Sequence, residues 1–539
     1  MSAEPLTDRP TDRSIDQLPP IPPVSVITLP PLPPEVRIGT ERERVVPERP
    51  SSVRTPGVSL RVISPRDAAN AIATCLDSVD EALPGMSARR RTSAGQRIGL
   101  IVLGIAIVIG LVLAAAGTAV VLVTVATLTY LLTLAFRVAA FGTSLRREVA
   151  IHIPDADALA ALDRDLPTYT VLVPAFAEPT VMANLVQSLE RIDYPRHLLD
   201  IKLLLEEGDR ETLAAVRAVE TELAIEVLIV PVGQPQTKPR ALNYGLLWSD
   251  GELVTVYDAE DRPEPLQLRR AAVAFAGLDR TVACLQARLE FYDADRNLLT
   301  KWFTIEYLTW FRCFLPGLVG MGAPPPLGGT SNHFRRESLV ASGAWDPFNV
   351  TEDVDLGLRL SRIGYRIEAL DSVTLEEANS DVVNWVKQRS RWQKGYLQTA
   401  LVHLRSPGHA RRQLGWRGLI HILLFVGGTP VLAVTNLAFW ALTCFWLVTK
   451  AEVIHSIFPA PVYYLSVGSW IIGNLTIFYL GVVTLLVSDR PKLLRAACLA
   501  PLYWVLMSIA GLRALIQLVV DPSHWEKTTH GLSHPTNIE

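Results

Sequence analysis

Cysteine is scarce in this 539-residue chain, and no two cysteines form a CxxC pair. The five cysteines are odd in number and widely scattered, at Cys75, Cys284, Cys313, Cys444 and Cys498. This pattern excludes a disulfide framework and a cysteine-based zinc site. We therefore expect the cysteines to be small buried or lipid-facing residues.

The chain also lacks an excess of basic residues over acidic ones. The formal net charge is −3 at pH 7, whereas domains that bind nucleic acid usually carry a clear excess of lysine and arginine. We therefore expect no nucleic-acid partner. Hydrophobic residues make up 49% of the chain and the mean hydropathy is +0.25, which favours a membrane protein.

Charged residues are absent from several long stretches. Residues 98–136 contain no Asp, Glu, Lys or Arg, and a helix needs about 20 apolar residues to span a bilayer. This run therefore predicts two transmembrane helices within residues 96–142, with a turn near Ala116–Gly117. The run is too long to be a cleaved signal peptide.

Further uncharged runs lie nearer the C-terminus. They cover residues 418–449 and 453–487, and a less uniform run covers residues 496–520. We expect about four transmembrane or interfacial helices within residues 416–520. A break at Gly427–Pro430 would divide the first of these runs into two short helices.

Basic clusters beside these runs predict their orientation. Arg89–Arg91 precedes the first run, Arg146–Arg147 follows it, and a third basic stretch covers Arg405–Arg417. The positive-inside rule places such clusters in the cytoplasm, so we expect a multi-pass protein whose middle region is cytosolic. With four helices after that region, the basic loop Ser488–Arg495 would face outward, against the same rule.

The remaining segments differ in composition. Residues 1–64 are rich in proline, which predicts a disordered tail that cannot build a packed core. We expect a short helical cytosolic segment over residues 65–95 and a C-terminal tail over residues 521–539.

Residues 150–415 have the pattern of an α/β domain. Short apolar runs at residues 169–174, 200–207, 225–231 and 252–258 alternate with amphipathic stretches. Near-continuous apolar strands that alternate with helices predict a parallel sheet covered on both faces. Because ligands bind at the carboxyl ends of the strands in such sheets, the polar residues just after each strand are the candidate site residues.

Acidic residues follow three of the expected strands. The fourth strand ends in Asp258-Ala259-Glu260-Asp261, and carboxylates two positions apart can both face a cation. Mg²⁺ and Mn²⁺ prefer oxygen ligands, which they take from carboxylates and substrate phosphates. An acidic turn can equally cap the following helix, so the residues alone leave both interpretations open. Glu178 follows the first strand, and Glu207 and Asp209 follow the second.

Two later segments combine acids, a guanidinium and an aromatic ring. Glu352 and Asp353 begin a helical stretch, where acids are also common for electrostatic reasons. Gln388, Arg391 and Trp392 are spaced so that they share one face of a helix. A guanidinium suits a phosphate and an aromatic ring suits a sugar. The alternative is a helix on the membrane surface with Arg and Trp as anchors.

Six motifs occur in a fixed order between residues 165 and 400. They are Val173-Pro174…Glu178, Lys238…Asn243, Asp258-Ala259-Glu260, Gly329-Thr330-Ser331-Asn332, Thr351-Glu352-Asp353 and Gln388-Arg389-Ser390-Arg391-Trp392. Together they resemble the family 2 glycosyltransferases of the processive type, which include cellulose, hyaluronan and related bacterial β-glycan synthases. Residues 502–531 also resemble, more loosely, the tail of bacterial family 2 synthases for exopolysaccharide or β-glucan.

This resemblance implies a GT-A fold, a Rossmann-like α/β catalytic domain inserted between transmembrane helix bundles. It also implies an inverting hexosyltransferase that uses a UDP-sugar and Mg²⁺ or Mn²⁺. Asp258 and Glu260 would match the metal-binding pair of the family. The motif reads Asp-Ala-Glu here, which leaves open whether Glu260 or Asp261 is the second ligand. Asp353 would be the general base that takes the proton of the acceptor hydroxyl.

The resemblance divides the other candidate residues between donor and acceptor. The residues that would bind the donor are Glu178, Glu207, Asp209, Lys238, Asp258 and Arg391. The residues that would bind the acceptor are Glu352, Gln388 and Trp392.

Four aromatic residues lie between the metal and TED motifs, at Trp302, Tyr307, Trp310 and Phe311. They fit either an amphipathic interfacial helix or the lining of an acceptor channel, and the interfacial helix is the favoured interpretation.

The leading hypothesis is a bacterial plasma-membrane enzyme that extends a β-glucan or related exopolysaccharide and exports it through its own helices. Its partners would be the UDP-sugar, the glycan acceptor, membrane lipids and accessory export or regulatory subunits. One alternative is the transfer of a single sugar to a lipid acceptor. An alternative of another class is a membrane transporter or scaffold with an inactive transferase domain, against which the intact acids argue.

Overall fold

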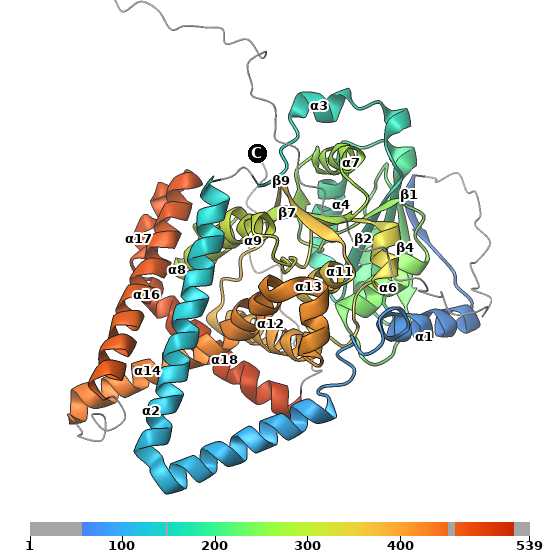
Figure 1. Ribbon diagram of the computed structural model, residues 1–539. Helices are drawn as coiled ribbons and strands as arrows, with labels where there is room; N and C mark the ends of the chain where they lie inside the picture. The colour runs from blue at the N-terminus through green and yellow to red at the C-terminus, as the bar shows by residue number, and fades with distance from the viewer. Residues whose placement is uncertain (1–55, 147–148, 451–458, 522–539) are drawn as a thin grey trace, which may run out of the picture. The chain divides into compact units, whose positions relative to one another are not determined.

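The computed structural model describes residues 56–146, 149–450 and 459–521 (Figure 1). Within these residues, nine strands form one mixed sheet in the order β1-β4-β3-β2-β5-β8-β7-β9-β6. The strands are β1 (Gly57–Leu60), β2 (Tyr169–Ala175), β3 (Leu199–Glu206), β4 (Ala224–Val230), β5 (Leu253–Val256), β6 (Arg262–Pro263), β7 (Val282–Phe291), β8 (Asn332–Arg335) and β9 (Arg366–Glu376).

The first half of the sheet is parallel, as the apolar runs predict. Strands β1, β4, β3, β2 and β5 pair in parallel, whereas β8 pairs antiparallel with both β5 and β7. Every side chain of β3 is buried, because helices cover both faces of this part of the sheet. The expectation of a parallel sheet therefore holds for one half, and the complete sheet is mixed.

Helices of the α/β domain connect the strands and cover the sheet. They include α3 (Asp155–Ala160), α4 (Met182–Glu190), α5 (Arg210–Arg217), α6 (Lys238–Leu247), α7 (Gln267–Gly277), α10 (Arg336–Ala341) and α11 (Glu352–Arg362). Short 3₁₀ turns η2 (Asp163–Asp165), η3 (Pro179–Val181) and η4 (Arg196–Leu198) lie between them. The apolar core on one side of the sheet includes Leu185, Leu203 and Phe275.

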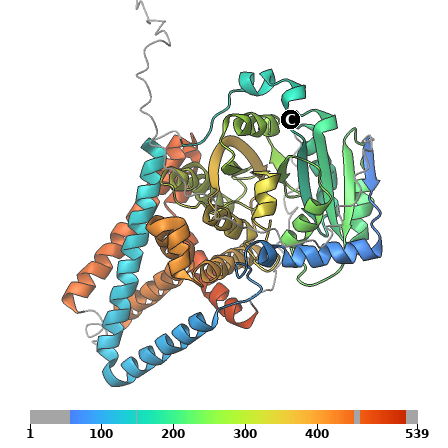
Figure 2. The same cartoon turned by 45° about the vertical axis from the view of Figure 1, so that its right-hand side comes forward.

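The end of the expected proline-rich tail is ordered. Gly57–Leu60 form β1, which pairs in parallel with Ala224–Val227 at the edge of the sheet (Figure 2). This corrects the assignment of residues 1–64 to a disordered tail for its last part, because a strand edge offers free backbone groups that the segment can pair with. Residues 1–55 and 522–539 of the expected tails lie outside the described residues.

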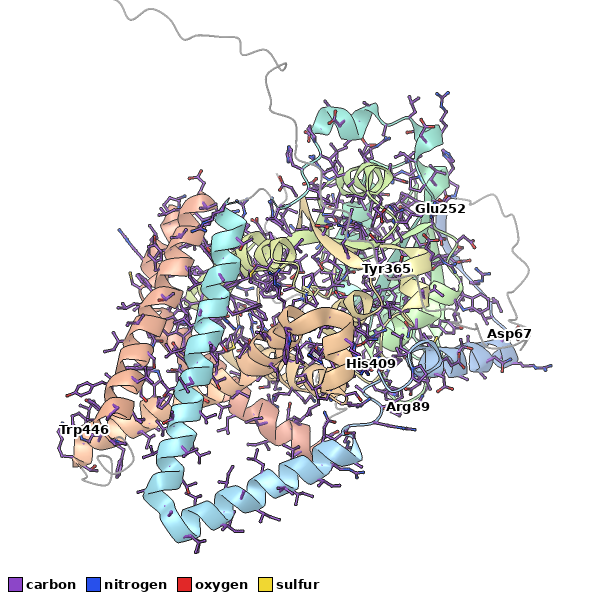
Figure 3. The ribbon with its side chains drawn as sticks, viewed as in Figure 1. Asp67, Arg89, Glu252, Tyr365, His409 and Trp446 are labelled. Atoms are coloured by element: carbon purple, nitrogen blue, oxygen red, sulfur yellow. The ribbon has the colours of Figure 1, made fainter. Side chains whose placement is uncertain are left out.

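The expected short helix before the membrane region is α1 (Pro65–Ala82), and its buried side chains include Cys75 and Val79. Arg89 follows in the segment that joins α1 to α2 (Figure 3). Its guanidinium donates to the Asp77 carboxylate at 2.7 Å and lies 4.6 Å from the Phe348 ring centre. These contacts fix the segment against the α/β domain.

Four helical stretches of the described residues are long and apolar enough to span a membrane. The first, α2 (Ala94–Arg146), has non-helical backbone angles at Ala114, and Figure 1 shows its two arms meeting there at a sharp bend. The sequence predicts a turn two residues further on. The second arm packs against α16 (Ala460–Val487).

Three apolar stretches follow the α/β domain. The first comprises α13 (Pro407–His421), the π-helical turn η6 (Ile422–Gly427) and α14 (Gly428–Thr449). The others are α16 and α18 (Ala500–Val520), and the short η7 (Pro491–Leu493) and α17 (Leu494–Ala497) lie between them. The predicted break at Gly427–Pro430 is wrong, because η6 carries the helix through the glycines.

The kink in the first of these stretches lies earlier than predicted. Gly415 has a positive φ of 66°, a conformation that residues with a Cβ rarely adopt. It separates the basic start of α13 from the apolar part. The estimate of about four helices after the domain therefore becomes three apolar stretches within the described residues.

The loop between α16 and α18 contacts the α/β domain. The Arg490 guanidinium lies 3.5 Å from the Glu290 carboxylate of β7, and Arg312 donates to the Val487 carbonyl at 3.5 Å. If three stretches cross the membrane instead of four, the basic loop Ser488–Arg495 lies on the same side as the α/β domain. The conflict with the positive-inside rule that four helices create is thereby removed.

Helices between the α/β domain and the apolar helices form a connecting layer. They are α8 (Leu298–Leu308), the π-helical turn η5 (Thr309–Phe314), α9 (Leu315–Gly320) and α12 (Val382–His403). Helix α12 packs against both α18 and η6, and η5 packs against α2. This layer carries the four aromatic residues and the Gln388–Trp392 motif (QxxRW) to the boundary between the sheet and the apolar helices.

Candidate active site

One cavity of about 710 Å³ joins the sheet to the apolar helices. At the sheet end it is lined by residues of β2, α6 and the turn after β5, and in the middle by α8, α11 and α12. It continues to α2, α14, α16 and α18, where Tyr130, Asn436 and Asn474 line it. The cavity thus begins at the carboxyl ends of the parallel strands, where the α/β pattern predicts a ligand site.

Lys238 and Asp258 meet across the sheet end of this cavity. The Lys238 ammonium donates a hydrogen bond to the Asp258 carboxylate and another, of 2.9 Å, to the Gly329 carbonyl. Although burial alone would lower the pKa of Lys238, the charges of Asp258 and Glu352 raise it above its ordinary value. A lysine that stays charged beside a carboxylate is suited to bind a phosphate group.

The turn after β5 separates Glu260 from Asp261. Glu260 lines the cavity, whereas Asp261 is only 1% exposed and accepts hydrogen bonds from the Asp258 amide at 2.8 Å and from the Thr330 hydroxyl. Burial, followed by the charges of Asp258 and Glu260, raises the pKa of Asp261 well above its usual range. Asp261 therefore holds the turn in shape, and Glu260 is the acid beside Asp258 that faces the cavity.

The residues at this turn fit a divalent cation of the Mg²⁺ or Mn²⁺ type. The described residues contain no cluster of three or more His, Cys, Asp or Glu side chains placed for a metal. Asp258 and Glu260 nevertheless offer two carboxylates to the cavity, and Mg²⁺ is commonly bound by one or two carboxylates together with substrate phosphates. The donor set is hard oxygen, which suits these ions.

Glu352 and Asp353 form a pair of buried acids at the start of α11. Burial raises the pKa of Glu352 to about 8, and the neighbouring Asp353 contributes to this shift. Burial also raises the pKa of Asp353 to about 6, although the Val354 amide donates to its carboxylate at 2.8 Å and opposes the shift. Glu352 is therefore the weaker acid of the pair, and Asp353 is the acid that ionises more readily.

Gly329 lies between Asp353 and Lys238. A Cβ at Gly329 would be 3.5 Å from an Asp353 carboxylate oxygen and 3.8 Å from the Lys238 ammonium. The general-base candidate and the phosphate-binding candidate thus face each other across one glycine. The structure brings together two motifs that are more than a hundred residues apart in the sequence.

Gln388, Arg391 and Trp392 of α12 all line the cavity, as their helical spacing predicts. The Gln388 side-chain oxygen is buried without a hydrogen-bond partner among the described residues. The Trp392 ring stacks on Tyr307 with a centroid distance of 6.3 Å. A ring held in this way offers a flat surface for a sugar.

Arg389 supports this arrangement, although the sequence analysis assigned it no role. Its guanidinium forms an ion pair with Glu306 at 2.6 Å and lies 4.3 Å from the Trp392 ring centre and 4.4 Å from that of Phe303. Arg389, inside the Gln388–Trp392 motif, thus helps to fix the Trp392 ring. A charged residue flanked by aromatic residues is the signal that could have indicated this role.

The four aromatic residues between the metal and TED motifs line the cavity. Trp302, Tyr307, Trp310 and Phe311 all lie on its wall, and Trp302 and Phe311 are buried. The side chains therefore line a cavity, which agrees with the alternative of a channel lining. The position of this helix at the membrane interface stays a prediction. Aromatic content alone does not distinguish a membrane-surface helix from a cavity wall.

The structure separates the acids that were expected to bind the nucleoside. Glu178 lines the cavity. Glu207 and Asp209 do not; Glu207 accepts a hydrogen bond from the Val232 amide at 3.0 Å, and Asp209 caps α5 and accepts from the Ala177 amide at 2.6 Å. Glu206, which the sequence analysis did not select, lines the cavity and pairs with Arg240 at 2.7 Å.

Glu376 is a further acid of the cavity that the sequence analysis missed. It ends β9 and lines the cavity. Its pKa is raised well above the usual range by burial and then by the charges of Asp261, Asp258 and Glu260. Its position at the end of a strand was the available signal, but β9 had not been predicted.

A family comparison agrees with this geometry. Residues 167–395 match the family described as "Glycosyltransferase like family 2". Residues 167–395 therefore form a family 2 glycosyltransferase domain, which contains most of the mixed sheet and is flanked by long apolar helices.

Individual relatives are distant. The probable glycosyltransferase YdaM of Bacillus subtilis is 25% identical over 244 residues, which are 45% of this chain and 58% of the relative. The β-monoglucosyldiacylglycerol synthase of Trichormus variabilis is 28% identical over 241 residues, or 44% of this chain and 50% of the relative. This chain thus spans about half the length of the curated relatives it matches.

The comparison with solved structures gives weaker matches. The mannosyltransferase PcManGT of Pyrobaculum calidifontis, solved in complex with GDP-mannose and Mn²⁺, has a TM-score of 0.42 and 18% identity. The match covers 73% of this chain and 99% of that protein.

Proposed function

We propose that the chain is a membrane-bound inverting glycosyltransferase that moves one sugar from a nucleoside-diphosphate donor to a hydroxyl of a lipid acceptor. The observation that carries the proposal is the single cavity that holds Lys238, Asp258 and Asp353 and continues between the apolar helices. A lipid can reach a site of this form from the bilayer, whereas a soluble acceptor has no need of the apolar end. The similarity to a β-monoglucosyldiacylglycerol synthase supports the same acceptor class.

In this proposal the donor lies at the sheet end of the cavity. A nucleoside diphosphate is a good leaving group only when its charge is neutralised. Lys238 and Arg391 line the cavity and supply two positive charges for the diphosphate. Glu178 borders the nucleoside, and the loop with Glu207 and Asp209 shapes the wall behind it.

Asp258 and Glu260 would hold the divalent cation. When bound, this ion would act as a Lewis acid and neutralise part of the charge on the diphosphate. The Lys238 ammonium binds the Asp258 carboxylate, so it also keeps this carboxylate in position.

The acceptor lies above Asp353, against Trp392. Asp353 is ionised at neutral pH, because its pKa is about 6, and it takes the proton of the attacking hydroxyl. Glu352 keeps its proton, because its pKa is about 8, and can donate a hydrogen bond to the acceptor. Gln388 and Trp392 orient the acceptor. One carboxylate suffices, because inversion needs no nucleophilic carboxylate on the enzyme.

Product analysis tests this function. The full chain in uncharged detergent micelles would be supplied with a UDP-sugar, Mn²⁺ and dioleoylglycerol, and the lipid products resolved by mass spectrometry. We expect one hexose per lipid, and loss of this product in Asp353→Asn. Glu337→Gln is the matched control, because it removes an exposed acid on α10. The absence of any sugar–lipid product with every UDP-sugar offered would contradict the proposal.

Processive synthesis of a polysaccharide is the second candidate. The Gln388–Trp392 motif favours it, because the resemblance associates this motif with processive synthases. The same assay distinguishes the two, since a polymer gives a ladder of products or material that stays at the origin in chromatography. A single hexose at long reaction times excludes processive extension.

A further inference from the structure

Arg137 is a charged residue within an otherwise apolar helix. It lies in the second arm of α2, nine residues before Arg146 at the end of the helix, or about 13 Å along the helix axis. Its side chain lines the active-site cavity. Ionisable residues inside transmembrane helices are costly and usually mark a functional site.

The direct contacts of Arg137 in the part of the chain that the structure describes are polar and aromatic, and none of them is to an acid. Its guanidinium donates to the Thr429 hydroxyl at 2.9 Å and lies 5.1 Å and 5.8 Å from the ring centres of Phe425 and Phe314. Its Nε atom is buried without a hydrogen-bond partner, and among the described residues Arg137 forms no ion pair. Cation–π contacts compensate a buried charge only in part.

The acid whose charge acts on Arg137, Glu306, is already paired with another arginine. Glu306 of α8 lines the cavity, but it forms the ion pair with Arg389 at 2.6 Å and accepts a hydrogen bond from the Tyr503 hydroxyl. The group of Arg137, Arg389 and Glu306 therefore carries one positive charge in excess. A ligand with one negative charge would balance it.

Tyr396 connects this cation to the reaction centre. Tyr396 lines the cavity on α12 and interacts electrostatically with both Asp353 and Arg137. The guanidinium and the general base therefore lie within electrostatic range of one side chain. An acceptor of the size of a lipid headgroup can place an anion at Arg137 and a hydroxyl at Asp353.

We propose that Arg137 binds the phosphate of an anionic phospholipid acceptor whose headgroup hydroxyl is glycosylated. This rests on the function proposed above, and it names the class of acceptor. In the reaction, the bond between the anomeric carbon and the diphosphate breaks and a bond to the headgroup oxygen forms. The hydroxyl proton passes to Asp353, the nucleoside diphosphate leaves, and the phosphodiester at Arg137 is unchanged.

A matched pair of lipids tests this inference. Dioleoylphosphatidylglycerol and dioleoylglycerol share their acyl chains and both present hydroxyls, but only the first carries a phosphate. With the full chain in uncharged polyoxyethylene detergent micelles, we expect phosphatidylglycerol to be the better acceptor. Arg137→Gln should raise the KM for phosphatidylglycerol at least about tenfold, because a charge-assisted hydrogen bond is lost, and Arg137→Lys should retain part of the preference.

Two further variants distinguish a loss of phosphate binding from a loss of folding. Thr429→Val removes only the hydroxyl that holds the guanidinium, so it should raise the same KM by a smaller factor. Arg146→Gln removes an exposed charge at the end of the same helix, outside the cavity lining, and should leave the lipid preference unchanged.

The outcomes separate this inference from the proposed function. If dioleoylglycerol is glycosylated and phosphatidylglycerol is not, or if Arg137→Gln lowers the use of both lipids by the same factor, the anionic acceptor is refuted and lipid transfer stands. Transfer to glycerol 3-phosphate in place of phosphatidylglycerol would assign the anion site to a soluble phosphate and refute the lipid. Without transfer to any acceptor, the proposed function itself fails.

Discussion

The Lys238 ammonium and the Asp258 carboxylate are in direct contact at the sheet end of the cavity. A lysine that pairs with a candidate metal ligand can also bind the diphosphate that the metal would bind. The pair therefore links the recognition of the donor to the geometry of the acidic turn.

We expect Lys238→Ala to weaken donor binding. The loss of one charge-assisted contact to a phosphate should raise the KM for the UDP-sugar about tenfold or more. Steady-state kinetics at saturating acceptor measures this change. Lys238→Arg should restore part of the affinity, and an unchanged KM for the donor in Lys238→Ala would remove this lysine from the donor site.

Glu260 and Asp261 should respond differently to substitution. Glu260→Gln removes a carboxylate that faces the cavity, so we expect at least about a tenfold loss of activity and a higher Mn²⁺ requirement. Asp261→Asn keeps an oxygen that can accept from the Asp258 amide and the Thr330 hydroxyl, and should retain most activity. Asp261→Ala should lower the melting temperature, because it leaves the Asp258 amide without its acceptor.

Titration with Mn²⁺ and thermal unfolding of the three variants check this assignment. If Asp261→Asn alone abolished the Mn²⁺ dependence while Glu260→Gln behaved as the unsubstituted protein, the second ligand would be Asp261. The sequence left this choice open, and the burial of Asp261 is the observation that favours Glu260.

The difference between these two acids shows what the sequence could and could not predict. Strand–helix alternation predicted β2 to β5 and therefore the edge at which Asp258 and Glu260 lie, because parallel strands place their carboxyl ends together. Whether a residue of the following turn faces inward depends on its hydrogen bonds to distant groups. The Thr330 hydroxyl that holds Asp261 is 69 residues away, so no local pattern reveals it.

The same dependence on contacts with distant residues explains the other differences between the predicted and the observed site. The composition of the aromatic residues around Trp310 suits a membrane interface as well as a cavity wall, so the sequence left both interpretations open. The burial of these residues depends on α2 and η6. These two elements lie before and after the aromatic residues in the sequence, and both pack against the layer of helices that carries them. Arg389 likewise has no recognisable role until Glu306 is placed beside it. Spacing thus predicted which residues share a face, but not what that face contacts.

Activity should fall in acid as Asp353 takes up a proton. Its pKa of about 6 means that the base is ionised above this pH and protonated below it, so kcat should decrease as the pH falls through about 6. Asp353→Asn should lower kcat by about 10²- to 10⁴-fold and abolish this acid limb. A rate profile between pH 5 and pH 8, with donor and acceptor saturating, measures the effect; an acid limb that persists in Asp353→Asn would assign it to another group.

Glu352 should make the stability of the protein depend on pH. Its pKa rises from an ordinary 4.5 to about 8 on folding, so the folded protein binds more protons than the unfolded one between these values. Stability contributed by the protonated acid is complete below about pH 4.5 and is lost as the pH rises through about 8. We expect the melting temperature to fall over this range in the unsubstituted protein and to fall less in Glu352→Gln. Parallel slopes for the two proteins would show that Glu352 does not carry the effect.

The loop Ser488–Arg495 should lie on the cytosolic side of the membrane. The contact of Arg490 with Glu290 ties this loop to the catalytic domain, and its positive charges agree with the positive-inside rule. A cysteine introduced by Asp489→Cys, after replacement of the two exposed native cysteines Cys444 and Cys498, should react with a membrane-impermeant maleimide only in inside-out vesicles. Trp446→Cys, near the end of α14 (Figure 3), is the matched control for the opposite side and should react only in right-side-out cells. Because α14 and α16 cross in opposite directions in this arrangement, labelling of both positions from one side would contradict it and restore an even number of helices after the catalytic domain.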